Sequence, residues 1–257
     1  MSNRVNMAIF SLELKRIVRD PLRMFFTVGL PASLYLVFGV SQDFADEPIN
    51  DGNVAMWIMI AMAAYGALGA TTSIGGMIAL ERMQGWTGQL GLTPMSPRQF
   101  IRVKVLTAAS LAGFTITAIY TLGAFTGAEA PLSVWIYSAI ILMLGAMTFS
   151  LYGLSFGMAF KSETALSASR GSLVPLAFFG NMFFPLSDWQ LTVAKFTPLY
   201  GYISLARRTL SEGQVLDGTT GELVPEPLWE VLANVTFWTV ALVGVAFFLF
   251  NREKARQ

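Results

Sequence analysis

The chain has 257 residues, of which 54% are hydrophobic and only 13% are charged. Because soluble domains carry about 25% charged residues, this composition indicates a membrane protein. The sequence contains no cysteine and no histidine, which excludes disulfides, thiol catalysis, metal sites built on thiolate or imidazole ligands, and histidine-based catalytic triads.

Residues 1–21 are predicted to form a helix that lies on the membrane surface. Phe10 and Leu14 fall on an apolar stripe at helical spacing, and Lys15 and Arg19 fall on the adjoining face. Asp20-Pro21 ends the helix, because a residue before proline disfavours the helical conformation. The helix is either a simple anchor or an element that also bears on a cytoplasmic partner.

Six apolar runs follow, and each is predicted to cross the bilayer, which requires about 20 apolar residues. The predicted spans cover about residues 22–42, 54–80, 100–127, 132–160, 165–187 and 229–251. The charge-free parts of the first and fifth spans are short, so we expect Arg23 and Arg170 to reach toward the cytoplasmic interface.

The basic residues predict the orientation of these spans. The segments on one side, which include both termini and Glu81–Lys104, carry 14 of the 17 lysine and arginine residues. Basic residues concentrate in cytoplasmic loops, so both termini are predicted to be cytoplasmic.

The most informative segment is Glu81–Lys104, between the second and third spans. Its first part is predicted to be a short helix, with Trp86 and Leu90 on one face. Its three glycines weaken a helix by roughly 1 kcal/mol each relative to alanine, so we expect a partner to support it. Thr93-Pro94 ends this helix, and Ser96-Pro97 begins the next one. The alternative is an ordinary interhelical loop without a partner.

The loop between the fifth and sixth spans is predicted to contain two parts. Residues 189–210 are too apolar for a solvated loop, and Pro198 divides them, so we expect a re-entrant pair of short helices on the outer side. Residues 212–227 are rich in glycine, proline and acids and are predicted to be exposed, with a hairpin around Asp217-Gly218.

Several absences restrict the function. The apolar cores of the spans contain no charged residue, which disfavours ion coupling through carboxylates but leaves coupling through backbone carbonyls open. The sequence offers no base or metal ligand for intramembrane hydrolysis and no GxxxxGK[ST] loop for ATP. We therefore expect no catalytic site, metal or cofactor on this chain, no nucleic-acid partner, and an energy source on another chain.

These features resemble the membrane subunit of an ABC-type exporter, in the family of six-span type-2 permeases. After the second span the resemblance rests on Glu81-Arg82, Gly85, Leu90, Thr93-Pro94, Ser96, Phe100 and Lys104. After the fifth it rests on Phe183-Phe184-Pro185-Leu186, Trp189, Phe196-Thr197-Pro198-Leu199-Tyr200 and Arg207-Arg208. The order of elements matches along almost the whole chain, but Trp86-Thr87 stands where the family typically has a Thr-Leu pair.

The resemblance implies an all-α membrane protein with one transmembrane domain, residues 1–257. It would combine six transmembrane helices with an N-terminal interfacial amphipathic helix, a cytoplasmic coupling helix between spans 2 and 3, and an outer re-entrant helical pair between spans 5 and 6. The implied location is the bacterial plasma membrane. A separate cytoplasmic ABC ATPase dimer would hold ATP and Mg, a second permease chain, identical or different, would complete the pore, and membrane lipid would surround both chains.

Two sets of site residues follow from the resemblance. The ATPase would contact the interfacial helix and the residues Glu81, Arg82, Gly85, Trp86, Thr87, Leu90 and Thr93. The cargo would occupy a cleft lined by Met62, Tyr65, Gly69, Thr72, Phe179, Asn181 and Phe183. This apolar wall favours an amphipathic or hydrophobic cargo such as a drug, lipid or lipopeptide, although the same residues also suit ordinary helix packing. The competing functions are a six-span scaffold or assembly factor and an ion-coupled secondary transporter.

Overall fold

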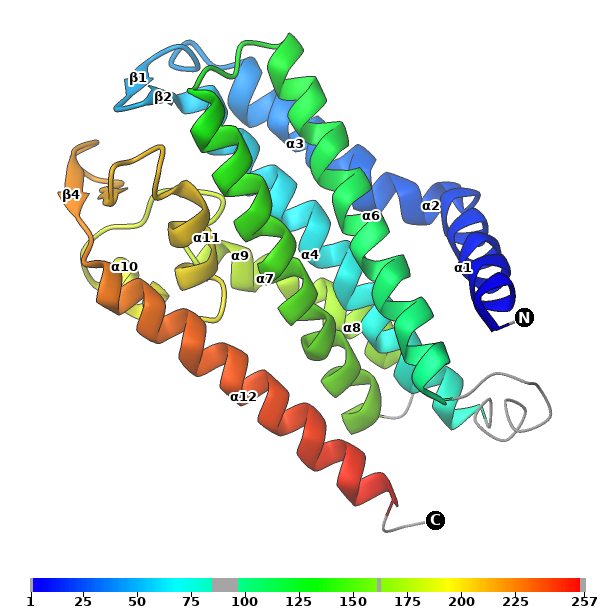
Figure 1. Ribbon diagram of the computed structural model, residues 1–257. Helices are drawn as coiled ribbons and strands as arrows, with labels where there is room; N and C mark the ends of the chain where they lie inside the picture. The colour runs from blue at the N-terminus through cyan, green and yellow to red at the C-terminus, as the bar shows by residue number, and fades with distance from the viewer. Residues whose placement is uncertain (1, 85–96, 161–162, 255–257) are drawn as a thin grey trace.

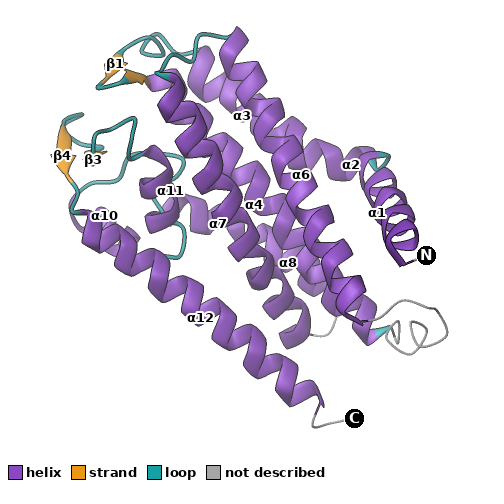
Figure 2. Ribbon diagram, viewed as in Figure 1, coloured by secondary structure: helices purple, strands orange, loops and turns teal. Residues whose placement is uncertain are grey.

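The computed structural model describes the chain except for residues 1, 85–96, 161–162 and 255–257. The described residues form one helical bundle with two small hairpins at one end (Figures 1 and 2). The helices are α1 (Ser2–Val18), α2 (Pro21–Met24), α3 (Leu30–Tyr35), α4 (Val54–Met83), α6 (Pro97–Phe125), α7 (Leu132–Phe160), α8 (Glu163–Gly171), α9 (Leu173–Phe179), α10 (Asp188–Ala194), α11 (Tyr200–Arg207) and α12 (Leu228–Lys254). The antiparallel hairpins pair β1 (Pro48–Ile49) with β2 (Gly52–Asn53) and β3 (Gln214–Leu216) with β4 (Leu223–Pro225).

Within the described residues, five helical stretches are long and apolar enough to cross a membrane. They are Pro21–Val40, Val54–Glu81, Gln99–Phe125, Leu132–Phe160 and Leu228–Arg252. Each coincides within a few residues with a predicted span. The chain is therefore a helical, multi-pass membrane protein.

The first of these stretches is not a regular α-helix. Two π-helical turns, η1 (Phe25–Gly29) and η2 (Leu36–Val40), flank α3. In the first turn the N–H of Leu30 bonds to the carbonyl of Phe25, five residues earlier. Such insertions widen the helix locally and are common where a helix serves a function.

The fifth predicted span, 165–187, differs from the structure. The helix formed by α8 and α9 ends at Phe179, and a turn follows. Asn181 adopts the left-handed conformation with φ of 58°, and its side-chain oxygen accepts the N–H of Leu186 at 2.8 Å. Gly180, Asn181 and Met182 at the start of this turn are buried, so protein covers this part of the apolar run. The six-span count stays a prediction.

Helix α4 lies inside the bundle and packs most extensively against α7. Glycines bring the two backbones almost into contact. A Cβ atom on Gly75 would lie 1.8 Å from the carbonyl oxygen of Ser150, and one on Gly153 would lie 1.9 Å from that of Thr72. Small residues permit this close approach. In a membrane, where helix association has no hydrophobic driving force, such close packing holds helices together.

The segment after the fifth predicted span contains two short helices and a hairpin at the predicted positions. Helices α10 and α11 lie on either side of Pro198, and strands β3 and β4 flank Asp217-Gly218. The Asp217 side chain holds the hairpin turn by accepting the N–H groups of Thr219 and Thr220 at 2.9 and 3.0 Å. The membrane position of the helix pair stays a prediction.

Candidate functional site

The predicted ATPase-facing residues lie only partly within the described structure. Glu81 and Arg82 belong to the end of α4. The others, Gly85, Trp86, Thr87, Leu90 and Thr93, lie outside the described residues. The structure describes the end of α4 and the start of α6, which flank this segment at the end of the bundle opposite the hairpins (Figure 1).

An ion cluster joins these helix ends to α1. The ammonium Nζ of Lys104 on α6 lies 2.6 Å from Glu13 Oε1 on α1 and 2.8 Å from Glu81 Oε1 on α4. Thr107 Oγ1 donates a second bond to Glu13, at 3.3 Å. The Lys104 side chain is only 3% exposed, and both carboxylates are about one-fifth exposed. One buried cation therefore holds two carboxylates, so loss of the lysine leaves two like charges together.

Only two of the three charged residues in this ion cluster were singled out from the sequence. Glu81 and Lys104 belong to the motif that carries the family resemblance, but Glu13 was missed. Glu13 is the single acid in the basic stretch of residues 1–19, which is the signal that could have singled it out.

Helix α1 turns part of its predicted apolar stripe toward the bundle. Phe10 packs near the buried Phe100, and Leu14 is half-buried. Lys15 and Arg19 are exposed, as the amphipathic pattern predicts. This helix is thus fixed to the protein by packing and by the Glu13 ion pair, in addition to any contact with lipid.

The predicted cargo-lining residues separate into two groups. Tyr65, Gly69 and Phe183 line cavities, and the Tyr65 and Phe183 rings meet edge to face with centroids 5.1 Å apart. Met62 and Thr72 are buried between helices, Asn181 is buried in the turn after α9, and Phe179 is exposed on the outside of the bundle. None of these last four lines either cavity described below.

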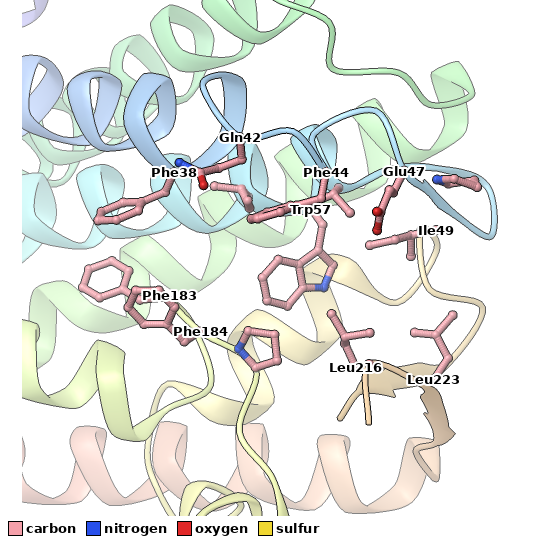
Figure 3. A pocket seen from close by; sticks show the side chains of 15 residues that line it. Phe38, Gln42, Phe44, Glu47, Ile49, Trp57, Phe183, Phe184, Leu216 and Leu223 are labelled. Carbon is pink, nitrogen blue, oxygen red and sulfur yellow. The ribbon is translucent and has the colours of Figure 1, made fainter. Parts of the chain in front are cut away.

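The larger cavity, of about 580 Å³, lies at the hairpin end of the bundle. Figure 3 shows that its wall combines aromatic rings from the end of the first span, the loop that follows it, the start of α4 and the turn after α9 with two leucines of the β3–β4 hairpin. The ring-bearing side chains are Phe38, Phe44, Trp57, Phe183 and Phe184. Gln42 and Glu47 add polar groups, so the cavity is mostly apolar with a few polar contacts, as ligand sites usually are.

The smaller cavity, of about 390 Å³, lies between the first span, α4 and the helix formed by α8 and α9. Tyr65 and Gly69 contribute from α4, and Arg170 contributes from α8. A Cβ atom on Gly69 would meet no atom within 4 Å, so this glycine borders open space. Residues of the predicted second and fifth spans thus border this cavity, and its role in binding cargo stays a prediction.

Arg207 holds the wall of the larger cavity in place. Its buried guanidinium donates to the carbonyl oxygens of Trp57, Asn181 and Met182 at 3.3, 3.0 and 2.9 Å. These bonds join α11 to the start of α4 and to the turn after α9. The sequence singles out Arg207 as part of the family pattern, but its position could not be predicted because its partners are backbone carbonyls.

Tyr200 and Glu226 form a buried hydrogen-bonded pair near Arg207. The Tyr200 hydroxyl donates a short hydrogen bond to the Glu226 carboxylate. Burial raises the pKa of Glu226, and burial together with the neighbouring Glu226 charge raises the pKa of Tyr200. The carboxylate therefore sits in an environment that disfavours its charge.

Comparison with known proteins identifies one kind of relative. No family model matches the chain. The chain is similar to "Putative transport permease YvfS" of Bacillus subtilis (strain 168), with 24% identity over 198 residues, which cover 74% of this chain and 79% of the relative. This similarity confirms the resemblance to a transport permease.

Proposed function

We propose that this chain is the permease subunit of an ATP-driven ABC exporter. It would move an amphipathic or hydrophobic cargo out of the cytoplasm by alternating access, with ATP and Mg held by a separate ATPase dimer. A second permease chain would complete the pore in the bacterial plasma membrane, with both termini cytoplasmic. The similarity to a transport permease supports this proposal.

The ion cluster of Glu13, Glu81 and Lys104 carries the energy-coupling part of the proposal. Glu81 is the first residue of the predicted ATPase-facing segment Glu81–Lys104, and Lys104 is its last. Because Lys104 binds both Glu81 and the interfacial helix α1, a partner that pushes on this segment would also move α1. The segment and α1 would thus respond to the ATPase as one unit.

The two cavities support the transport part of the proposal. They lie on α4 and on the segment containing α8, α9 and the following turn, which are the elements that the family resemblance assigns to the cargo path. Both are bordered mainly by apolar side chains. Cavities of this size and character suit a small amphipathic molecule.

Purification of the chain from the membranes of the organism that produces it tests the proposal. A tagged copy of the full chain should recover an ATPase that carries a GxxxxGK[ST] loop. Recovery of the chain alone, without transport activity, would favour the scaffold function. Transport driven by a proton gradient in the absence of any ATPase would favour a secondary transporter, and either result would overturn the exporter.

A further inference from the structure

The smaller cavity combines an apolar wall with an unused positive charge. Among the described residues, the buried Nε and Nη2 atoms of Arg170 have no hydrogen-bond partner. A guanidinium has five donors in a fixed fork that matches carboxylate or phosphate. A buried donor without an acceptor costs free energy. An anion in the cavity bordered by Arg170 would supply the acceptors that these donors lack.

The charges around Arg170 leave this region positive. Among the side chains that the structure describes, the charged groups that act on Arg170 are Arg23 and Asp20, at the start of the first span. Asp20 is already engaged, because its Oδ1 accepts the backbone N–H of Arg23 at 3.1 Å and its Oδ2 lies 3.9 Å from Arg23 Nε. Two arginines against one partly exposed aspartate give a net positive charge next to the cavity.

The apolar wall extends from this charge to the lateral surface of the bundle. Phe26 and Leu30 line the cavity from the first span, and Leu173 and Val174 line it from α9. Phe26 and Val174 are also exposed, at 53% and 39%. In a membrane such exposed side chains face lipid, so the cavity is accessible to a molecule already in the bilayer.

We propose that this cavity binds an amphiphile with an anionic headgroup. The phosphate or carboxylate would accept hydrogen bonds from Arg170, and the apolar part would lie along Phe26, Leu30 and Val174. The binding of such an amphiphile does not depend on the proposed exporter function. Its role as the transported cargo does. The inference narrows the cargo from any amphipathic molecule to an anionic one.

Binding of two fluorescent lipids to the full chain in detergent tests this proposal. Phosphatidylglycerol and phosphatidylcholine with the same labelled acyl chains differ in net charge but not in tail. We expect the phosphatidylglycerol probe to bind about tenfold more tightly, because both headgroups offer a phosphate but the choline cation of phosphatidylcholine is repelled by the net positive charge next to the cavity. Arg170→Gln should remove this preference, and Gly69→Leu, which fills the cavity, should weaken both probes.

Arg252→Gln is the matched control, because it removes one exposed positive charge away from the cavity. It should leave the preference intact. Loss of the preference in this control as well would show general surface attraction and overturn the site. Equal binding of the two probes, or an unchanged preference in Arg170→Gln with retained thermal stability, would also overturn it.

Inorganic phosphate distinguishes an amphiphile from a free anion. We expect millimolar phosphate to leave the bound phosphatidylglycerol probe in place; displacement at that concentration would contradict the amphiphile. All of these measurements use the chain without an ATPase. Failed lipid selectivity therefore counts against this inference alone, and failed ATPase recovery counts against the exporter function alone.

Discussion

The guanidinium carbon of Arg207 lies 3.2 Å from the centre of the Trp57 ring, and both side chains are buried. A cation over an indole face is the most favourable of the cation–π pairs. The contact fixes α11 against the first turns of α4. The hydrogen bonds from Arg207 to the carbonyl groups of Asn181 and Met182 fix the turn after α9. A single side chain thus joins three segments that lie far apart in the sequence.

Arg207→Met should lower the free energy of unfolding by about 3 kcal/mol, because three buried carbonyl groups lose a charged donor. Thermal unfolding in detergent, followed by tryptophan fluorescence, measures the loss. The adjacent Arg208→Met is the control, since Arg208 donates one bond, to the Glu226 carbonyl at 3.2 Å. Equal losses in the two variants would contradict the bracing role.

Lys104→Met should be strongly destabilising, by about 3 kcal/mol, because it leaves the Glu13 and Glu81 carboxylates facing each other without a cation. Adding Glu13→Gln and Glu81→Gln to this variant should restore much of the loss. Lys195→Met provides the comparison: Lys195 binds Glu230 at 2.7 Å but is 38% exposed, and exposed pairs contribute about 1 kcal/mol or less. A Lys104 variant no less stable than the Lys195 variant would refute the cluster.

Gly75→Ala and Gly69→Ala should differ sharply although both lie on α4. The methyl group at residue 75 would overlap the backbone of α7, whereas the methyl at residue 69 enters open space. We expect the first to lower the melting temperature by several degrees, in line with a cost of about 2 kcal/mol for overpacking. The second should leave the melting temperature unchanged or raise it slightly, because no clash opposes the gain of up to about 1 kcal/mol in helix propensity. Similar melting temperatures would contradict the close α4–α7 contact.

Glu226→Gln should become more stabilising, relative to the unsubstituted chain, as pH rises. Burial raises the pKa of Glu226 in the folded chain above its usual value of 4.5, so the folded state binds more protons than the unfolded state between these two pKa values. Stability then falls as pH rises through this window and is constant above it. Melting temperatures of both proteins from pH 4 to pH 8 test this: a pH-independent difference would show that the raised pKa is absent.

Sequence patterns predicted the long helices well because their signal is local. Residues 132–160 form one uncharged run, and α7 has those same bounds. Proline and glycine located the breaks: Pro198 separates α10 from α11, and Asp217-Gly218 lies in the β3–β4 turn. In each case the residue type fixes the backbone conformation without help from distant segments.

The end of the fifth span could not be placed from hydropathy alone. A buried turn and a lipid-facing helix can be equally free of charge, so the span was predicted to continue to residue 187, past the end of α9 at Phe179. The Gly180-Asn181 pair was the available signal, since these two residue types commonly end helices in the left-handed conformation. The Glu13–Lys104 pair was harder to foresee, because 91 residues separate its members and no local pattern links them.

The most direct test of the exporter function is ATP hydrolysis in proteoliposomes that contain the chain and the ATPase recovered with it. Residues 85–93 are replaced by a Gly-Ser linker of equal length, and a control replaces residues 217–222 in the same way. We predict that the 85–93 variant still inserts but no longer raises ATP hydrolysis above that of the ATPase alone, while the control does. Unchanged stimulation by the 85–93 variant would contradict energy input at the segment between Glu81 and Lys104.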